Sequence, residues 1–238
     1  MPSFVSKKFK PSLSDAFYFI RNELFRKINE HAPELKGRLL DFGCGSKPYQ
    51  SLFLNATEYT GLDYESEGHS HANENIDVIY DGKEIPFADE YFDSVFSSEV
   101  FEHIFNLEEI IPEIKRVLKK EGKILMTCPF VWNEHETPVD YARYTQFALK
   151  HLFEKNGFEV LLQDKSGDFT MAIYQMRMAY FNEHFIPAFP LLGRSKFFRT
   201  NIPPLINPIL NLWFSFWHSI LPKRKDLYLN NILLAKKL

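Results

Sequence analysis

The chain has little cysteine, with Cys44 and Cys128 as its two thiols in 238 residues. Two cysteines so far apart provide neither a disulfide framework nor the paired spacing of a zinc site. Net charge is also small, because 28 Lys and Arg stand against 31 Asp and Glu, which gives −3. Without a basic stripe to hold phosphates, we expect no nucleic-acid partner. The scarcity of cysteine is typical of a reducing, cytoplasmic location.

Segment 1–15 lacks the continuous apolar core of a secretory signal, although it contains lysines. Internal repeats and low-complexity segments are missing as well. What is present is an ordinary globular balance, with 45% hydrophobic and 25% charged residues. Aromatic residues reach 16%, so we expect wide apolar pockets or surfaces. The length predicts one domain with a sizeable core, or one domain with an insertion.

Short apolar segments alternate with helical patterns along most of the chain. This alternation predicts an α/β fold, a parallel sheet with helices on both faces. Each of two expected helices ends at a glycine: helix 107–122 at Gly122 and helix 145–157 at Gly157. An N-terminal helix is expected over 12–37, and strands are expected at 37–43, 58–65, 76–82, 92–100, 122–130, 158–167 and 226–237.

The stretch "LLDFGCGSKPY" predicts a ligand-binding loop. Gly43 and Gly45 follow the first strand, where glycine lets the backbone approach a ligand closely. Asp63 ends the second strand, 18 residues beyond Gly45, at the spacing of an acid that holds ribose hydroxyls. A pyrophosphate-binding loop would carry a third glycine where Ser46-Lys47-Pro48 stand. With Asp41 at its base, the loop better suits the ammonium and sulfonium charges of S-adenosylmethionine.

Four segments together carry a family resemblance: "LLDFGCGSKPY", "YTGLDYE", "DVIYDGKEIPFADEYFDSVFSSEVFEHI" and "RVLKKEGKILMTCPF". In this order they resemble the successive motifs of class I S-adenosylmethionine-dependent methyltransferases, most closely the broad type 11 methyltransferase domain. The resemblance implies a seven-stranded Rossmann-like methyltransferase sheet with S-adenosylmethionine as its cofactor. Lys47-Pro48 departs from the commonest loop of this family and occurs in a subgroup of it.

The same resemblance assigns cofactor contacts to the ends of the first four strands. It implies Asp41, Gly43, Cys44 and Gly45 for the methionine part, Asp63 for the ribose, Tyr64, Asp81 and Gly82 for the adenine, and Ser98 and Glu99 for the floor of the site.

The loop after the fifth strand is dense in polar and aromatic residues, and loops at this edge are where ligands bind in open α/β sheets. His135 is the candidate general base, because its ordinary pKa lies near ~6.5. Glu136 or Asp140 would orient its ring, and Arg143 would hold an anionic group of the substrate. Alternatively, the loop only caps the pocket, and Asp140 pairs with Arg143. The segment "HETPVDYARYT" resembles methyltransferases encoded beside glycan enzymes, which implies a sugar hydroxyl as acceptor.

No metal is expected from the sequence. The pair Glu102-His103 opens a helical segment and lacks a second pair of ligands, so packing and capping are the predicted roles.

Residues 203–222 contain no charged side chain, which invites comparison with a membrane span. Against this, Pro203, Pro204 and Pro208 are expected to break the helix, and a single span would separate the last strand from its sheet. The organisation expected is a helix at 1–35, a cofactor domain at 36–168, an apolar helical insertion at 169–226 and a final strand at 227–238. The insertion is interpreted as a lid or homodimer surface, or as a helix that touches the inner face of a membrane through 203–225.

The function expected is methyl transfer from S-adenosylmethionine to a small-molecule or glycan acceptor, at a sugar hydroxyl. A quinone-like apolar ring is the alternative acceptor, since the Phe-rich insertion would accommodate one. A scaffold that binds the cofactor without turnover also stays open, and a hydride-transferring dehydrogenase is the weakest alternative because the third glycine is missing.

Overall fold

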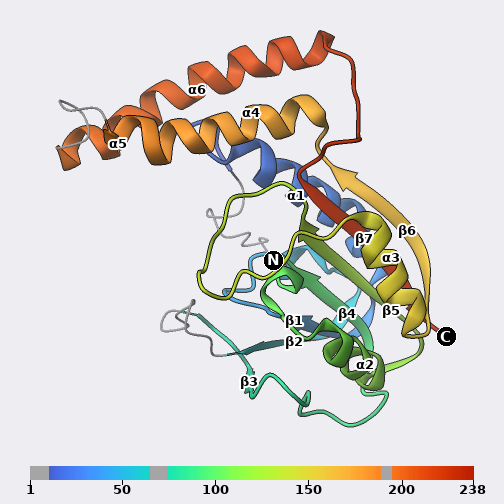
Figure 1. The fold of residues 1–238 in the computed structure, drawn as a ribbon. Coiled ribbons are helices and arrows are strands. Elements are labelled where there is room, and N and C mark those ends of the chain that lie inside the picture. The colour runs from blue at the N-terminus through green and yellow to red at the C-terminus, as the bar shows by residue number, and fades with distance from the viewer. Residues whose placement is uncertain (1–10, 65–73, 189–194) are drawn as a thin grey trace.

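The computed structural model describes residues 11–64, 74–188 and 195–238, and its centre is one seven-stranded sheet. The strand order is β3-β2-β1-β4-β5-β7-β6, and β7 alone runs antiparallel to its neighbours. This arrangement confirms the expected Rossmann-like α/β sheet with its last strand in the same sheet (Figure 1). The strands are β1 Gly37–Phe42, β2 Ala56–Tyr64, β3 Val78–Tyr80, β4 Phe92–Ser98, β5 Leu118–Pro129, β6 Phe158–Ser166 and β7 Asn230–Lys237.

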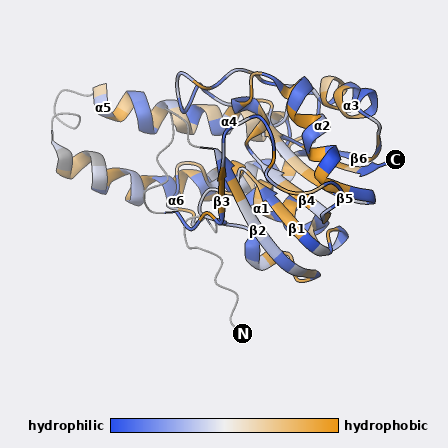
Figure 2. Ribbon diagram, turned by 90° about the horizontal axis from the view of Figure 1, so that it is seen from below, coloured by the Kyte–Doolittle hydropathy of each residue, from blue (hydrophilic) through white to orange (hydrophobic). Residues whose placement is uncertain are grey.

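Helices cover both faces of this sheet, because neighbouring apolar residues of the central strands point to opposite sides. Leu40 and Ile124 pack beneath α2 (Leu107–Val117) and α3 (Gln146–Lys155). Their neighbours Leu39 and Leu125 belong to the cluster under α1 (Tyr18–His31). In Figure 2 the central strands show hydrophobic stretches, in orange, between hydrophilic ones.

The predicted end of the helix at Gly122 is wrong. Helix α2 ends at Val117, and β5 begins at Leu118 directly after it. Gly122 instead lies inside the strand, where an added Cβ would be 2.7 Å from the Leu118 side chain. The glycine is needed for this close approach and does not stop a helix. The prediction for Gly157 is confirmed, since it follows α3 with φ of +77° in the left-handed region.

A helical layer lies beside the sheet, formed by α4 (Phe169–Tyr180), a π-helical turn (Phe181–Phe185), α5 (Ile186–Ala188) and α6 (Lys196–Ile220). Figure 1 shows α4 and α6 next to each other above the sheet. Asp168 caps α4 and also accepts a hydrogen bond from His218 near the end of α6, at 2.7 Å. The two helices are therefore tied where one begins and the other ends.

The prediction that prolines break this segment is wrong. Helix α6 runs for 25 residues through Pro203, Pro204 and Pro208. Each proline lacks an N–H, so the carbonyl four residues earlier loses its helical partner. Pro204, four residues before Pro208, supplies one of these carbonyls, and Pro204 is exposed to water. This part of the helix therefore faces solvent, and the helix continues through all three prolines.

Two asparagines dock α6 onto the chain before α1. Asn211 donates to the carbonyls of Leu13 and Asp15 at 2.7 and 3.1 Å, and Asn207 donates to that of Ser14 at 3.1 Å. Both amides are about 99% buried. Within the described residues, no helix has the length and apolar character that a bilayer crossing requires.

Candidate active site

A cavity of about 620 Å³ opens at the carboxyl ends of the parallel strands. One wall comes from the ends of β1, β2, β3 and β4, and the other from η3 (Phe101–His103) and the loop after β5. This is the edge at which open α/β sheets bind ligands. Among the residues lining it are Gly43, Gly45, Asp63, Tyr64, Asp81, Gly82, Glu99, His103, Glu136 and Tyr141.

Asp63 holds the glycine loop in place. One carboxylate oxygen accepts the Gly45 N–H at 2.7 Å, and the other accepts the Tyr64 N–H at 2.8 Å. A carboxylate oxygen has lone pairs for more than one donor, so both can also receive ligand hydroxyls. Asp63 therefore lies in the cavity as expected and, in addition, fixes the loop beside it.

Lys47 explains why the loop does without a third glycine. Its backbone is left-handed, with φ of +52°, and its ammonium reaches Asp77 at 2.5 Å. The same Asp77 carboxylate accepts the Gly61 N–H at 2.6 Å. The lysine stem crosses Gly61 so closely that a Cβ there would lie 2.3 Å from it. The loop is thus clamped by an ion pair and leads into a short 3₁₀ turn, Gln50–Leu52, without a long helix.

Three of the expected cofactor residues do not line this cavity: Asp41, Cys44 and Ser98. Asp41 is buried under the loop and accepts a hydrogen bond from the Tyr59 hydroxyl at 2.5 Å. Its burial raises the pKa of the carboxyl to about 7. Cys44 is buried, and the Ser98 hydroxyl pairs with that of Thr127 at 2.9 Å. These residues support the loop and the strand end from below.

Glu99 lies at the cavity floor with a left-handed backbone, φ of +56°, which is unusual for a residue other than glycine. Its carboxylate accepts hydrogen bonds from the Thr127 hydroxyl at 2.8 Å and from the Asn230 amide at 2.6 Å. Burial raises the pKa of Glu99 to about 7. Asn230 begins β7, so the last strand supplies a hydrogen bond to Glu99 that no local sequence motif predicts.

The loop after β5 contains a closed ion pair. Asp140 accepts two hydrogen bonds from the Arg143 guanidinium, at 2.5 and 2.7 Å, and one from the backbone N–H of His135 at 3.0 Å. Burial opposes the charge of Asp140, but these donors lower its pKa to about 2. Of the four expected catalytic residues, Glu136 lines the cavity, whereas His135, Asp140 and Arg143 do not.

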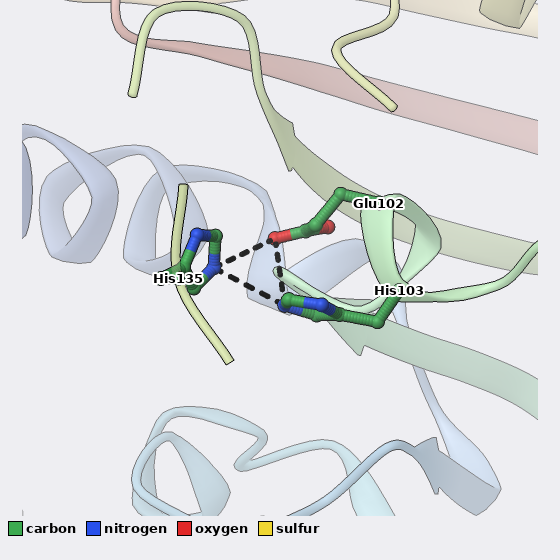
Figure 3. A group of neighbouring side chains, drawn as sticks. All are labelled: Glu102, His103 and His135. Carbon is green, nitrogen blue, oxygen red and sulfur yellow. Dashed lines mark hydrogen bonds and ion pairs between the residues drawn. The ribbon is translucent and has the colours of Figure 1, made fainter. Parts of the chain in front are cut away.

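His135 turns toward η3 (Figure 3), and its Nε2 lies 3.1 Å from Nε2 of His103. Burial and the neighbouring His103 lower the pKa of His135. Glu102 completes the group: its side chain is fully buried, and neither oxygen has a hydrogen-bond partner among the described residues. The capping role expected for Glu102 is not seen, because no side chain caps η3. Sequence reasoning missed this group because His135 is 32 residues away from His103.

The residues of the cavity fit S-adenosylmethionine. Gly43 has φ of +73°, and a Cβ there would lie 2.3 Å from Val100, so only glycine keeps this wall open. Carboxylates of Asp63, Asp81 and Glu99 line the space, with Lys83 as the one lining cation in the described residues. Carboxylates favour cationic and hydroxylated ligand groups over phosphates. The Tyr64 ring, beside Gly82, offers an aromatic face for a base.

Comparison with known proteins agrees with this chemistry. A family model described as a methyltransferase domain, of the type 11 group, matches residues 40–126. The chain is 25% identical over 115 residues to a phosphatidylethanolamine N-methyltransferase of Cereibacter sphaeroides, and 31% identical over 127 residues to the mitochondrial ubiquinone biosynthesis O-methyltransferase of Bos taurus. A solved S-adenosylmethionine-dependent methyltransferase of Archaeoglobus fulgidus shares the fold with a TM-score of 0.56 and 18% identity, over 97% of both chains.

These two sequence matches cover parts of the proteins concerned. They involve 44% and 46% of this chain, and they account for 57% and 34% of the two relatives. The chain thus spans a little over half of the first relative and about a third of the second, and the family model matches residues 40–126.

Proposed function

The chain carries a class I S-adenosylmethionine-dependent methyltransferase domain, and from this premise we propose that it transfers a methyl group to an acceptor hydroxyl in the cavity between the glycine loop and the loop after β5. The observation that carries the proposal is the composition of that cavity. Residues predicted for the cofactor, such as Asp63 and Gly43, share it with Glu136 from the predicted acceptor loop.

S-adenosylmethionine supplies an electrophilic methyl carbon when it is bound. In the proposal, Asp63 holds the ribose hydroxyls and Tyr64 covers the adenine, while Glu99 faces the cationic end of the cofactor. Holding an acceptor oxygen in line with a methyl carbon accounts for much of the rate of such a transfer.

We assign the acceptor's hydroxyl proton to Glu136. Its carboxylate lines the cavity, whereas the ring of the expected base, His135, is directed at His103. His135 and Asp140 then hold the loop that presents Glu136. The left-handed backbone of Glu136, φ of +49°, supports such a role, because strained residues other than glycine cluster at functional sites.

Glu136→Gln tests this assignment. The substitution keeps the side chain's size but removes the basic oxygen, so we expect kcat to fall about 100-fold with cofactor affinity unchanged. Glu134→Gln is the matched control, since Glu134 is exposed in the same loop and does not line the cavity. Equal kcat values for the two variants would remove Glu136 from the mechanism.

The proposed acceptor is a sugar hydroxyl, and a hydroxylated quinone-like ring is the second candidate. The second is favoured by the relative named for ubiquinone biosynthesis. It is also favoured by an apolar cavity of about 630 Å³ between Val131, α4 and the π-helical turn. Such a cavity suits an acceptor with an apolar portion, which a lipid-linked sugar also has.

Methyl-labelled cofactor distinguishes the candidates. The panel contains free sugar nucleotides, polyprenyl-linked sugars and hydroxylated quinols, and label is located in each product by mass spectrometry. Label on a sugar oxygen supports the first proposal, and label on a ring oxygen supports the second. Cofactor binding without transfer to any acceptor would support the scaffold alternative.

We further propose that α6 contacts a lipid surface. Apolar residues recur on its exposed side at helical spacing: Leu205, Ile209, Leu212, Trp213, Phe216 and Ile220. Lys223, Arg224 and Lys225 follow two residues after the end of the helix at Ile220. An apolar stripe with aromatic residues and adjacent cations is typical of helices that lie in a membrane interface. No residue of this layer lines the 620 Å³ cavity within the described chain, so a lid over that cavity is not supported.

Sedimentation with vesicles tests this contact. We expect binding to vesicles that contain anionic lipid and loss of binding in Trp213→Ser/Phe216→Ser. Asn201→Ser, an exposed position of the same helix, is the control. A dimer that buries the stripe in solution and no vesicle binding would replace the lipid surface with a second copy of the chain.

A further inference from the structure

Three donor atoms converge beside the cavity from two distant segments. They are one carboxylate oxygen of Glu102 and the Nε2 atoms of His103 and His135, which lie within reach of a single ion (Figure 3). The two nitrogens are 3.1 Å apart, and the oxygen lies 3.7 Å from one and 3.9 Å from the other.

The contacts on the far side of each ring indicate which nitrogens carry protons. Nδ1 of His103 lies 2.8 Å from the Val139 carbonyl oxygen, which can only accept, so this nitrogen is the donor. Nδ1 of His135 has two oxygens at 3.3 Å, the Asn133 carbonyl and an Asp140 carboxylate, against one donor, Arg143 Nη2, at 3.4 Å. The two acceptors favour a proton on Nδ1 of His135 as well.

With both protons on Nδ1, the two Nε2 lone pairs face each other. Two lone pairs 3.1 Å apart repel unless a positive centre lies near them. The opposite tautomer of His135 would make an ordinary hydrogen bond to His103, but it would turn the Nδ1 lone pair toward two oxygens. Metal-bound imidazoles characteristically donate their second N–H to a carbonyl or carboxylate, as both rings do here.

Glu102 supplies an independent observation. Its side chain is fully buried, and neither oxygen finds a hydrogen-bond donor in the part of the chain that the structure describes. A buried carboxylate without a donor is costly unless a proton, an opposite charge or a metal ion compensates it. The two imidazole Nε2 atoms lie 3.7 and 3.9 Å from one of its oxygens, so a cation between these three atoms would compensate the charge.

We propose that Glu102, His103 and His135 form a binding site for one divalent cation of the zinc class at the cavity wall. The point equidistant from three atoms separated by 3.1, 3.7 and 3.9 Å lies about 2.1 Å from each of them, which is the usual bond length from zinc to imidazole nitrogen and carboxylate oxygen. Two imidazoles with one carboxylate also match the ligand preference of zinc. Glu136, with an oxygen 3.8 Å from His103 Nε2, lies at the edge of this site, so the cation would be next to the carboxylate to which we assign the acceptor's proton.

A second group of side chains, Glu30, His31 and Asp164, has a similar composition but a different environment. The Lys27 ammonium already contacts both of its carboxylates. Its charges are therefore balanced within the chain, and Glu30 is exposed. This group serves as an internal control for adventitious binding.

Calorimetry with Zn²⁺ and the visible spectrum of bound Co²⁺ test the proposal on chelator-treated full-length protein, without cofactor or acceptor. We expect one tight site per chain and a Co²⁺ spectrum of low coordination number. Glu102→Gln and His135→Gln should each weaken binding at least about thirty-fold. His31→Gln and His151→Gln, which alter the control group and an exposed histidine, should bind within about twofold of the wild type.

Several results would overturn the site: no cation binding by the wild type, unchanged binding by folded Glu102→Gln, or loss of binding in His31→Gln. If Glu102→Gln does not fold, the thermal shift on adding Zn²⁺ decides, because it should occur in the wild type and be missing in His135→Gln. The site does not rest on methyl transfer. Failure to bind S-adenosylmethionine would leave the cation result standing, and failure to bind Zn²⁺ would leave the proposed function standing.

Discussion

The carboxyl edge of the sheet and helix α6 place their polar residues in opposite ways. At the sheet edge, Asp63 and Glu99 line an open cavity, and apolar residues fill the core beneath. On α6, the polar Asn207 and Asn211 are buried, and Leu205 and Ile209 are exposed. The edge is arranged to receive a ligand in water. Helix α6 is arranged to dock through hydrogen bonds on one side and to present an apolar surface on the other.

The largest effect predicted for the sheet edge is a pH dependence of stability, and it comes from Asp41 beneath the glycine loop. Its carboxyl has a pKa of about 7 in the folded chain, against 3.8 ordinarily, because it is buried. The folded state therefore holds this proton more tightly than the unfolded state. Asp41 therefore adds about 4 kcal/mol to the free energy of unfolding below about pH 4, and this contribution is lost as the pH rises through about 7.

Asp41→Asn removes this titration and keeps an acceptor for the Tyr59 hydroxyl. The free energy of unfolding, measured in urea from pH 4 to 8, should rise in the variant relative to wild type as pH increases. Parallel curves for the two proteins would show that Asp41 is not buried as described.

Gly43→Ala gives the next largest effect. The left-handed backbone costs about 1–2 kcal/mol with a side chain present, and the overlap with Val100 at 2.3 Å adds strain, so we expect about 3 kcal/mol in all. A double-mutant cycle with Val100→Ala separates the two causes. In the background of Val100→Ala, Gly43→Ala should destabilise the chain less. Full additivity of the two changes in free energy of unfolding would contradict the contact.

On α6, Asn211→Leu should destabilise the chain despite adding an apolar residue to a helix. It removes the donor to the carbonyls of Leu13 and Asp15 and the acceptor for the Tyr174 hydroxyl. Leaving these groups unpaired costs about 2 kcal/mol. Asn201→Leu, exposed on the same helix, is the matched control, and a thermal melt compares them. Equal melting temperatures for the two variants would contradict the docking role of Asn211.

The smallest effect on stability is predicted for the apolar stripe of α6, the exposed residues Leu205, Ile209, Leu212, Trp213, Phe216 and Ile220. Ile209→Gln, at a residue that is 68% exposed, should change the free energy of unfolding by less than about 0.5 kcal/mol. Chemical denaturation measures this. A loss of 2 kcal/mol or more would mean that the stripe is packed within the chain.

The sequence predicted the sheet edge well because its signals are local. Glycines after a strand and an acid at the end of the next strand are set by backbone geometry within a few dozen residues, and Gly43, Gly45 and Asp63 lie in the cavity as expected. Asp41 was placed in the same loop, but the strand's alternation turns it beneath the loop, out of the cavity.

The acceptor side and α6 were harder to predict because their contacts join distant segments. His103 meets His135 only when the loop after β5 folds back over η3, and Glu99 meets Asn230 across 131 residues. The prolines of α6 carry the local signal of a helix break, but the helix runs through all three of them and is held by its buried asparagines. Local propensity alone does not contain this tertiary information.

The central claim, that the sheet edge binds S-adenosylmethionine through Asp63, is tested most directly by calorimetric titration of the full chain. The titrants are S-adenosylmethionine, S-adenosylhomocysteine and NAD, and the variant is Asp63→Asn, which keeps an oxygen for one of the two backbone N–H groups that Asp63 accepts, those of Gly45 and Tyr64. We expect both adenosyl ligands to bind the wild type, the variant to bind them at least about tenfold more weakly, and NAD not to bind. Well-folded wild-type protein that binds neither adenosyl ligand, or that binds NAD instead, would contradict the account.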